Sequence, residues 1–231
     1  FIHINYEMSF DFKVWLDDIF ERSSFITQII WKQWPGVGPA LTSSYANKFP
    51  SMYQPILQYS KTSKKYYKKQ MISYTQKEIE SWTKIDENGN TYREIAVWNK
   101  KTAKKLEDQG LIIKDEVYHS TKYGDFPKAR KYDLGDGKVI GNIWTDINFV
   151  ARPNYPTEKP VKLLTRIIDS SCPPGGIVLD PYMGSGTTCV AAYQNGMMYI
   201  GIDEKQEALD LTRKRLDEIP DLFIEGSVKG Y

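Results

Sequence analysis

The most constraining feature of this 231-residue chain is an apolar run that leads into a glycine-rich loop. Ile177-Val178-Leu179 has the continuous apolar character of a buried parallel strand, and Gly184-Ser185-Gly186 then opens a helix. A second apolar run over residues 199–202 is followed by Asp203 and another amphipathic helix. Strand, helix, strand and helix at this spacing predict a βαβ unit, and therefore an α/β fold with a largely parallel sheet.

The same loop predicts a site for a ligand that carries an anionic group and a free ribose. Glycines let the backbone approach a ligand, and the N–H groups at a helix start attract negative charge. Asp203 follows Asp180 at about the distance where an acid accepts hydrogen bonds from ribose hydroxyls. A nucleoside triphosphate site needs a lysine where Thr187 stands, and a dinucleotide site needs a glycine where Cys189 stands. S-adenosylmethionine therefore fits best, and a glycine turn without a ligand is the alternative.

Composition narrows the class of protein further. Charged residues make up 26% of the chain and hydrophobic residues 41%, as in globular proteins. No apolar run reaches the roughly 18 residues of a membrane span, and residues 1–10 lack the features of a signal peptide. Two cysteines, Cys172 and Cys189, and two histidines argue against a disulfide framework or a zinc site. We therefore expect a cytoplasmic protein without a metal.

Positive charge is concentrated in the middle of the chain. Residues 61–138 carry 18 Lys and Arg against 12 Asp and Glu, whereas the remainder carries 13 basic and 17 acidic residues. This asymmetry predicts a surface that faces a polyanion, with a solvated lysine-rich surface as the alternative. Elsewhere, Phe12, Trp15, Leu16, Ile19 and Phe20 have the spacing of an amphipathic helix.

Three motifs closely resemble those of the β-class DNA amino-methyltransferases. They are Asn154-Tyr155-Pro156-Thr157-Glu158-Lys159-Pro160, then Asp180-Pro181-Tyr182-Met183-Gly184-Ser185-Gly186-Thr187-Thr188, then Tyr199-Ile200-Gly201-Ile202-Asp203. Members of that family transfer a methyl group from S-adenosylmethionine to adenine N6 or cytosine N4, often in restriction–modification systems. The resemblance covers most of residues 1–60 and 128–216.

The resemblance implies a fold, a domain division and a set of cofactor contacts. The fold is Rossmann-like, with a mostly parallel sheet, an antiparallel edge strand and an inserted target-recognition region. The methyltransferase core comprises residues 1–60 and 144–231, and the recognition region comprises residues 61–143. The implied contacts to S-adenosylmethionine are Thr157, Lys159, Pro160, Asp180, Tyr182, Gly184, Ser185, Gly186 and Asp203.

The catalytic motif of that family is absent from the sequence. Asp or Asn followed by Pro-Pro and an aromatic residue does not occur, and by position we expect it shortly before Phe1. In the family its oxygens accept hydrogen bonds from the target amine of an extruded base, which directs the nitrogen lone pair at the methyl group. We interpret Cys172 and Cys189 as structural rather than nucleophilic. His3 and His119 are likewise interpreted as structural or surface residues.

The expected partner is double-stranded DNA, together with a second copy of the chain or a restriction subunit. The candidate phosphate contacts are Lys64, Lys65, Lys68, Lys69, Lys128, Arg130 and Lys131. Trp34, in a Pro/Gly-rich loop, is either a mobile element near the target base or an ordinary packing residue. We expect adenine N6 as the target, with cytosine N4 as the alternative. A catalytically silent DNA-binding subunit and an RNA or small-molecule methyltransferase are the competing functions.

Overall fold

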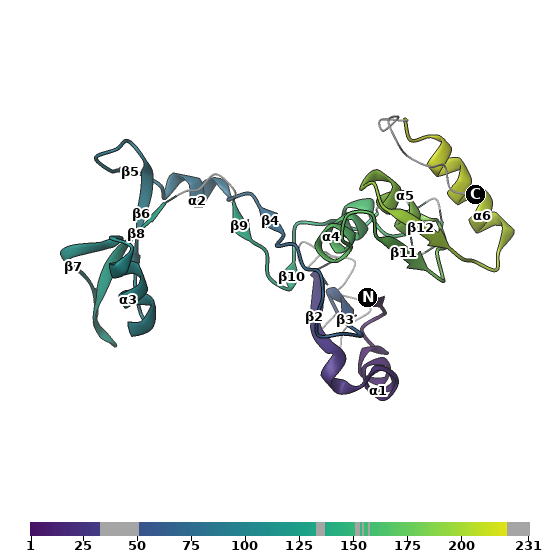
Figure 1. Ribbon diagram of the computed structural model, residues 1–231, viewed down its shortest axis with the longest axis horizontal. Helices are drawn as coiled ribbons and strands as arrows, with labels where there is room; N and C mark the ends of the chain where they lie inside the picture. Colours follow the sequence, from purple (N-terminus) through teal and green to yellow (C-terminus); the bar gives the residue numbers. More distant parts are fainter. Residues whose placement is uncertain (33–50, 133–136, 151–152, 154, 157, 221–231) are drawn as a thin grey trace, which may run out of the picture. The chain divides into compact units, whose positions relative to one another are not determined.

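The computed structural model describes residues 1–32, 51–132, 137–150, 153, 155–156 and 158–220, except for the side chain of Asp115. The chain forms two compact units (Figure 1): Phe1–Gln70 with Ile140–Tyr231 is unit 1, and Met71–Val139 is unit 2. Residues 61–70 and 140–143, which the sequence interpretation assigns to the recognition region, thus lie in unit 1. Within the described ranges, no helix is both long and apolar enough to span a membrane.

Unit 1 contains a four-stranded sheet with the order β1-β3-β2-β10. The strands are β1 (Ile2–His3), β2 (Phe25–Lys32), β3 (Tyr53–Tyr59) and β10 (Ile143–Trp144). Strand β2 is rich in the β-branched and aromatic residues that favour extended chains. It pairs antiparallel with β3 and parallel with β10, so the sheet is mixed.

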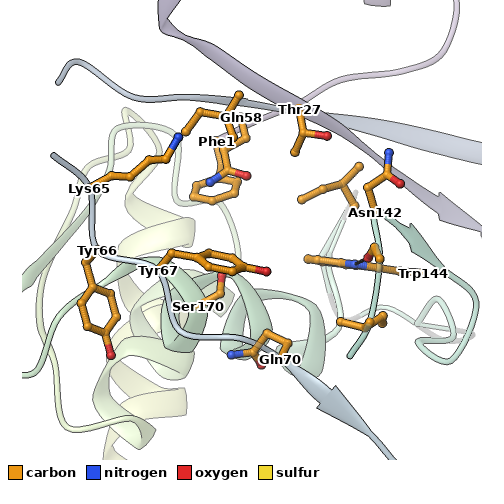
Figure 2. Close-up of a pocket in the computed structure, with 14 residues that line it drawn as sticks. Phe1, Thr27, Gln58, Lys65, Tyr66, Tyr67, Gln70, Asn142, Trp144 and Ser170 are labelled. Carbon is orange, nitrogen blue, oxygen red and sulfur yellow. Dashed lines mark hydrogen bonds between the residues drawn. The ribbon is translucent and has the colours of Figure 1, made fainter. Parts of the chain in front are cut away.

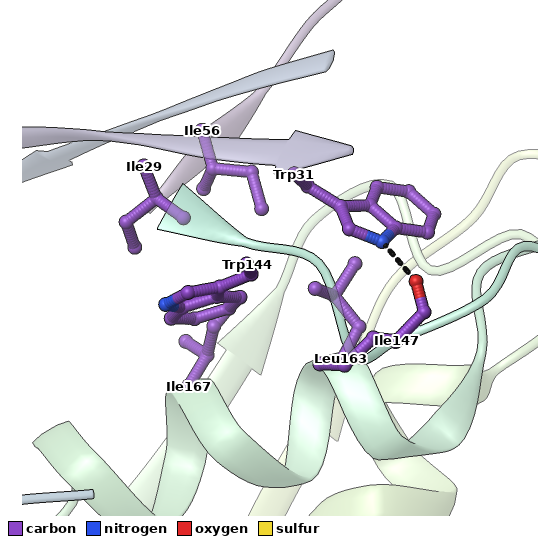
Figure 3. Close-up of a cluster of buried hydrophobic side chains, with 7 residues drawn as sticks. All are labelled: Ile29, Trp31, Ile56, Trp144, Ile147, Leu163 and Ile167. Atoms are coloured by element: carbon purple, nitrogen blue, oxygen red, sulfur yellow. Dashed lines mark hydrogen bonds between the residues drawn. The ribbon is translucent and has the colours of Figure 1, made fainter. Parts of the chain in front are cut away.

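Helix α4 (Val161–Ser171) covers one face of this sheet, and their contact is the main core of unit 1. Figure 3 shows its members, which are Ile29, Trp31, Ile56, Trp144, Ile147, Leu163 and Ile167. The Nε1 atom of Trp31 donates a hydrogen bond of 2.8 Å to the carbonyl of Ile147, so the buried indole N–H is satisfied. This core fixes the start of α4, which carries the Glu158-Lys159-Pro160 segment.

A second sheet of unit 1 contains β11 (Ile177–Asp180) and β12 (Met198–Gly201), which pair in parallel as predicted. Helix α5 (Thr187–Gln194) connects them, and α6 (Gln206–Asp217) packs against α5. The sequence predicts buried strands, and this expectation is wrong for one face: Ile177 and Leu179 are each 59% exposed. Only Val178 of β11 contacts the core formed by α4 and α5, because these helices cover a single side.

Helix α1 (Ser9–Phe20) forms where the apolar spacing predicts it, followed by the short 3₁₀ helix η1 (Arg22–Ser24). Its predicted apolar face is not the buried face, since Leu16 is buried whereas Trp15, Ile19 and Phe20 are exposed. Among the described elements α1 packs mainly against η1 and β3, which is too little surface to cover a full helical stripe.

Unit 2 is an antiparallel sheet with two helices. Its strands β5 (Lys84–Ile85), β6 (Thr91–Ala96), β7 (Ile112–Ser120) and β8 (Gly124–Tyr132) have the order β5-β6-β8-β7. Helix α2 (Gln76–Glu80) begins with a capping box, and α3 (Lys100–Asp108) begins at Asn99. Strands β4 (Met71–Ile72) and β9 (Lys138–Val139) pair where the chain enters and leaves the unit.

The predicted α/β class is confirmed, and the sheets are more divided than the sequence suggests. In unit 1, two of the four strand pairings among described residues are parallel and two are antiparallel. The parallel pairings are those that need a long connection, through α5 for one and through the whole of unit 2 for the other.

Candidate functional site

The glycine loop between β11 and α5 has a backbone that only glycine suits at two positions. Gly184 has φ 51° and Gly186 has φ 71°, both in the left-handed region. A Cβ atom on Gly186 would lie 2.2 Å from the Oγ1 atom of Thr212 in α6, and one on Gly184 would lie 3.3 Å from the ring of Tyr155. The loop is therefore packed closely between α6 and the segment that precedes α4.

Asp203 follows β12 and is tied to this loop. Its Oδ2 atom accepts a hydrogen bond of 2.9 Å from the backbone N–H of Gly184, and Oδ1 accepts one of 3.0 Å from that of Lys205. These bonds lower the pKa of the carboxyl below its ordinary value, so the group is ionised at neutral pH. A carboxylate has about four acceptor positions, so Asp203 retains capacity to accept a hydrogen bond from a ribose hydroxyl.

Asp180, at the end of β11, holds the loop against α5. Its carboxylate accepts hydrogen bonds from the Tyr182 N–H at 3.0 Å and from the Thr188 hydroxyl at 2.5 Å. The Ser185 side chain is buried and its hydroxyl pairs with that of Thr187 at 3.0 Å, so it acts within the loop. Tyr182 is 89% exposed, which leaves its ring free to contact a ligand.

Arg215 organises the site, and sequence reasoning missed it. Its Nη1 atom donates hydrogen bonds to the Ser185 carbonyl at 2.7 Å and to the Thr187 hydroxyl at 3.1 Å. The same atom lies 3.1 Å from a carboxylate oxygen of Glu158, and the two side chains are only 19% and 10% exposed. Arg215 thus joins α6, the glycine loop and the segment before α4. The one available signal was Glu158 itself, within the Tyr-Pro-Thr-Glu-Lys-Pro motif.

The remaining predicted cofactor residues lie at the start of α4. Pro160 is the N-cap of that helix, and Lys159 is partly buried, which lowers the pKa of its amine. Its positive charge contributes to lowering the pKa of His3 to about 4, although burial of the imidazole is the larger cause. Thr157 lies outside the described residues. The structure thus brings Asp180, Gly184, Ser185, Gly186 and Asp203 together directly, and it connects the 158–160 segment to them through Arg215.

The seven candidate phosphate contacts are divided between the units. Lys64, Lys65, Lys68 and Lys69 lie in unit 1, and Lys128, Arg130 and Lys131 lie on β8 of unit 2. Three are occupied by ion pairs: Lys68 with Asp169 at 2.6 Å, Lys128 with Glu116 at 3.1 Å, and Arg130 with Glu87 at 3.3 Å. Lys64, Lys69 and Lys131 are exposed and form no ion pair with a described residue. Trp34 lies outside the described residues.

A cavity of about 310 Å³ lies elsewhere in unit 1, between the four-stranded sheet and the C-terminal end of α4 (Figure 2). Its lining includes Tyr67 and Trp144, the amides Gln58 and Asn142, and Lys65. None of the described cofactor candidates lines it, so it is separate from the glycine loop.

The cysteines and His119 have no geometry for nucleophilic or metal chemistry. Burial raises the pKa of Cys189 to about 11 and also raises that of Cys172, so both remain thiols. The Nδ1 atom of His119 lies 2.7 Å from Asp125 on the exposed surface of unit 2, a partner that the sequence did not indicate. In the part of the chain that the structure describes, no group of three His, Cys, Asp or Glu residues could hold a metal ion.

A family model described as DNA methylase matches residues 1–214 of the chain. The type II methyltransferase M2.DpnII of Streptococcus pneumoniae is 43% identical over 101 residues, which are 39% of this chain and 38% of that protein. The DNA adenine methyltransferase YhdJ of Escherichia coli K12 is 39% identical over 97 residues, covering 40% of this chain and 33% of YhdJ. The type II methyltransferase M.EcaI of Enterobacter cloacae is 28% identical over 247 residues, covering 93% of this chain but 52% of M.EcaI.

The chain therefore spans about half or less of these relatives. Among solved structures, the crystal structure of the M1.HpyAVI–SAM complex matches with a TM-score of 0.50 at 18% identity. The match covers 93% of this chain and 72% of that one, so the two share a fold.

Proposed function

This chain belongs to the DNA methylase family, and we propose that the protein transfers the methyl group of S-adenosylmethionine to N6 of adenine in duplex DNA. The Rossmann-like methyltransferase fold expected from the sequence agrees with this membership. The cofactor is S-adenosylmethionine, whose sulfonium supplies an electrophilic methyl group. The protein's own contribution is to bind the cofactor, to hold the DNA and to receive an extruded base.

The observation that carries the proposal is the junction between Gly184 and Asp203. The carboxyl ends of two parallel strands meet there, which is where open α/β sheets bind their ligands. Residues Gly184–Gly186 receive the charged amino-acid end of the cofactor, Asp203 accepts hydrogen bonds from the ribose, and Tyr182 covers the adenine. Lys159, Pro160 and Thr157 complete the site from the segment before α4. No catalytic residue is assigned within the chain, because the Asp/Asn-Pro-Pro-aromatic motif does not occur in it.

Adenine N6 is favoured by the printed name of YhdJ, a DNA adenine methyltransferase with 39% identity over 97 residues. Cytosine N4 is the second candidate, since the matching family model covers both N6 and N4 methylases. The two reactions present the same chemistry to the enzyme, an exocyclic amine on an extruded base.

Cofactor binding is tested by calorimetry on Asp203→Ala. Loss of hydrogen bonds to a charged acceptor is worth roughly 1.5–3 kcal/mol, so affinity for S-adenosylmethionine should fall by about 10- to 150-fold. Asp210→Ala, which removes an exposed carboxylate from α6, is the matched control and should bind normally. Equal affinity in the two variants would remove Asp203 from the ribose role.

The reaction is tested by incubating plasmid DNA with the full-length protein and S-adenosylmethionine, followed by nucleoside mass spectrometry. N6-methyladenine is the expected product. N4-methylcytosine would establish the second candidate instead, and the absence of both products would contradict methyl transfer to DNA.

A further inference from the structure

Unit 2 carries four aromatic rings in one cluster, of which three are exposed and the fourth, Phe126, is partly buried. The aromatic cluster consists of Trp98, Tyr118, Tyr123 and Phe126, and Trp98 is 58% exposed. The centroid of the Trp98 ring lies 4.2 Å from that of Phe126, 6.3 Å from that of Tyr118 and 6.2 Å from that of Tyr123. Large rings stabilise a protein most when they are buried, so a contiguous exposed group marks an interaction surface.

The backbone holds Trp98 in this exposed position. The preceding residue, Val97, is buried and its N–H donates a hydrogen bond of 2.9 Å to the Pro127 carbonyl. The following residue, Asn99, caps α3 through its side chain, which accepts a hydrogen bond of 2.8 Å from the Lys101 N–H. Because both neighbours are anchored, the indole is presented on a rigid support rather than on a loose loop.

A groove of about 490 Å³ adjoins Trp98 on the same unit. Ser81, Thr83, Lys84, Arg93 and Glu94 are among the residues that line it. Glu94 is neutralised by ion pairs with Lys84 and Lys128. Arg93 forms no ion pair with a described residue, and its buried Nε atom has no hydrogen-bond partner there. The Ser81 hydroxyl already donates to the Glu78 carbonyl, and the Cζ atom of Arg93 lies 5.1 Å from the centroid of the Trp82 ring. The groove therefore offers a guanidinium that no described carboxylate neutralises.

Cations also border the aromatic cluster itself. The Nζ atom of Lys122 lies 5.0 Å from the centroid of the Tyr123 ring. Lys100 and Lys101 are exposed and begin α3 directly after Trp98 and Asn99. Asp125, the acidic residue beside Phe126, is paired with His119. Rings for stacking and cations for phosphate are the two components of surfaces that bind unpaired nucleotides.

We propose that the aromatic cluster and the adjoining groove bind a DNA strand whose bases are unstacked, with bases on the rings and phosphate at Arg93. This inference rests on the proposed function in taking DNA as the polyanion. It adds a site in unit 2 that is distinct from the glycine loop and borders the candidate phosphate contact Lys128, which pairs with Glu94 of the groove. A protein partner is less favoured, since the groove beside Trp98 is lined largely by polar and charged side chains.

The test measures binding of the full chain to two labelled duplexes, one fully paired and one with a three-base bubble. Trp98→Ala should weaken binding to the bubble by about 5- to 150-fold, the loss expected for one stacked base. The salt dependence of bubble binding should be the same for Trp98→Ala and the parent protein, because the substitution removes no charge. Trp98→Phe should retain most of the affinity, and Tyr123→Ala provides a second truncation at an exposed position. Trp15→Ala is the matched control, since Trp15 is 53% exposed in unit 1.

Arg93→Met tests the phosphate contact and keeps the aliphatic stem. The slope of log affinity against log salt concentration should become shallower by about one unit.

Unchanged bubble binding in both Trp98→Ala and Tyr123→Ala would overturn the inference. A change in self-association without a change in DNA binding would also overturn it, by making the cluster a protein contact. A protein that binds the bubble through Trp98 but yields no methylated base contradicts only the proposed function. A protein that methylates DNA while Trp98→Ala binds normally contradicts only this inference.

Discussion

Single atoms decide the geometry of the glycine loop. Gly186 combines a left-handed backbone with a contact that leaves no room for a side chain, since its Cβ would lie 2.2 Å from Thr212 Oγ1. The Thr212 hydroxyl is itself held by a hydrogen bond of 2.8 Å to the Ala208 carbonyl, so it does not easily move away. The shapes of the loop and α6 therefore fit each other at Gly186 and Thr212.

Gly186→Ala should lower the free energy of unfolding by several kcal/mol, because it adds a steric clash to left-handed strain. Gly196→Ala is the matched control: Gly196 has φ 68°, but no atom lies within 4 Å of its Cβ position. Backbone strain alone should lower the free energy of unfolding of Gly196→Ala by about 1–2 kcal/mol. Urea unfolding of both variants measures the difference between their free energies of unfolding. Equal losses in the two variants would mean that the Thr212 side chain moves to make room.

His3 should make stability depend on pH between about 4 and 6.5. Burial, and secondarily the charge of Lys159, lowers its pKa in the folded state to about 4, whereas the unfolded chain titrates near 6.5. Between these values the unfolded state binds more protons, so stability decreases as pH falls through that range, by up to about 3 kcal/mol.

His3→Phe should remove most of this decrease, measured as the free energy of unfolding in urea at about pH 5 and about pH 7.5. His119 is the only other histidine of the chain and is exposed. His119→Asn is therefore the control, and this variant should retain the decrease in stability at low pH. An unchanged pH dependence in His3→Phe would show that His3 is not the group that causes it.

Elements of unit 1 are held together at the site by one cation. Arg215 connects α6 to the glycine loop and to Glu158, so three segments that are distant in sequence share one guanidinium. Removing one partner of a buried ion pair leaves the other charge uncompensated. The resulting loss in the free energy of unfolding exceeds the stability that the intact pair contributes.

Arg215→Met should therefore destabilise the protein by roughly 3–5 kcal/mol and weaken binding of S-adenosylmethionine through the displaced loop. Adding Glu158→Gln should restore part of the stability, since neither member of the former ion pair then carries a charge. Arg213→Met on the exposed side of α6 is the control and should change little. Thermal unfolding and calorimetry measure both effects, and a double variant less stable than Arg215→Met would contradict this role.

Local sequence signals predicted the elements of the site well, and long-range packing explains what they missed. The strand, glycine loop, helix and Asp203 are contiguous, so residues 177–203 specify that geometry among themselves. The contact between Glu158 and Arg215 depends on how α6 packs, which no local pattern encodes. The burial of β11 and α1 failed for the same reason, because an apolar stripe does not show what covers it.

At the scale of the whole molecule, the positive surplus does not follow the boundary of the inserted unit. Residues 71–139 carry 13 basic and 12 acidic residues, whereas residues 61–70 carry five lysines and no acid. The surplus therefore belongs to a segment of unit 1. Its lysines are exposed, and only Lys68 forms an ion pair with a described residue.

Lys64→Gln with Lys69→Gln should make the salt dependence of DNA binding shallower, by up to about two in the log–log slope. Arg213→Gln with Lys214→Gln removes the same charge from α6, where both side chains already face acids at 3.7 and 3.9 Å. That control should leave the slope unchanged. Identical slopes for the two double variants, measured by salt titration, would show that the 61–70 lysines are solvated and make no DNA contact.

The insertion of unit 2 also sets an order of events during synthesis. The N–H of Ile140 donates a hydrogen bond of 2.9 Å to the carbonyl of Gln70, so unit 1 resumes at the point where it was interrupted. Trp31 bonds to a residue 116 positions later, and its core is completed only by α4. Unit 2 is continuous in sequence and can fold while the ribosome is still producing the rest. Until α4 is made, strands β2 and β3 lack the helix that completes their core. Exposed apolar strands of this kind aggregate readily, and chaperones protect them.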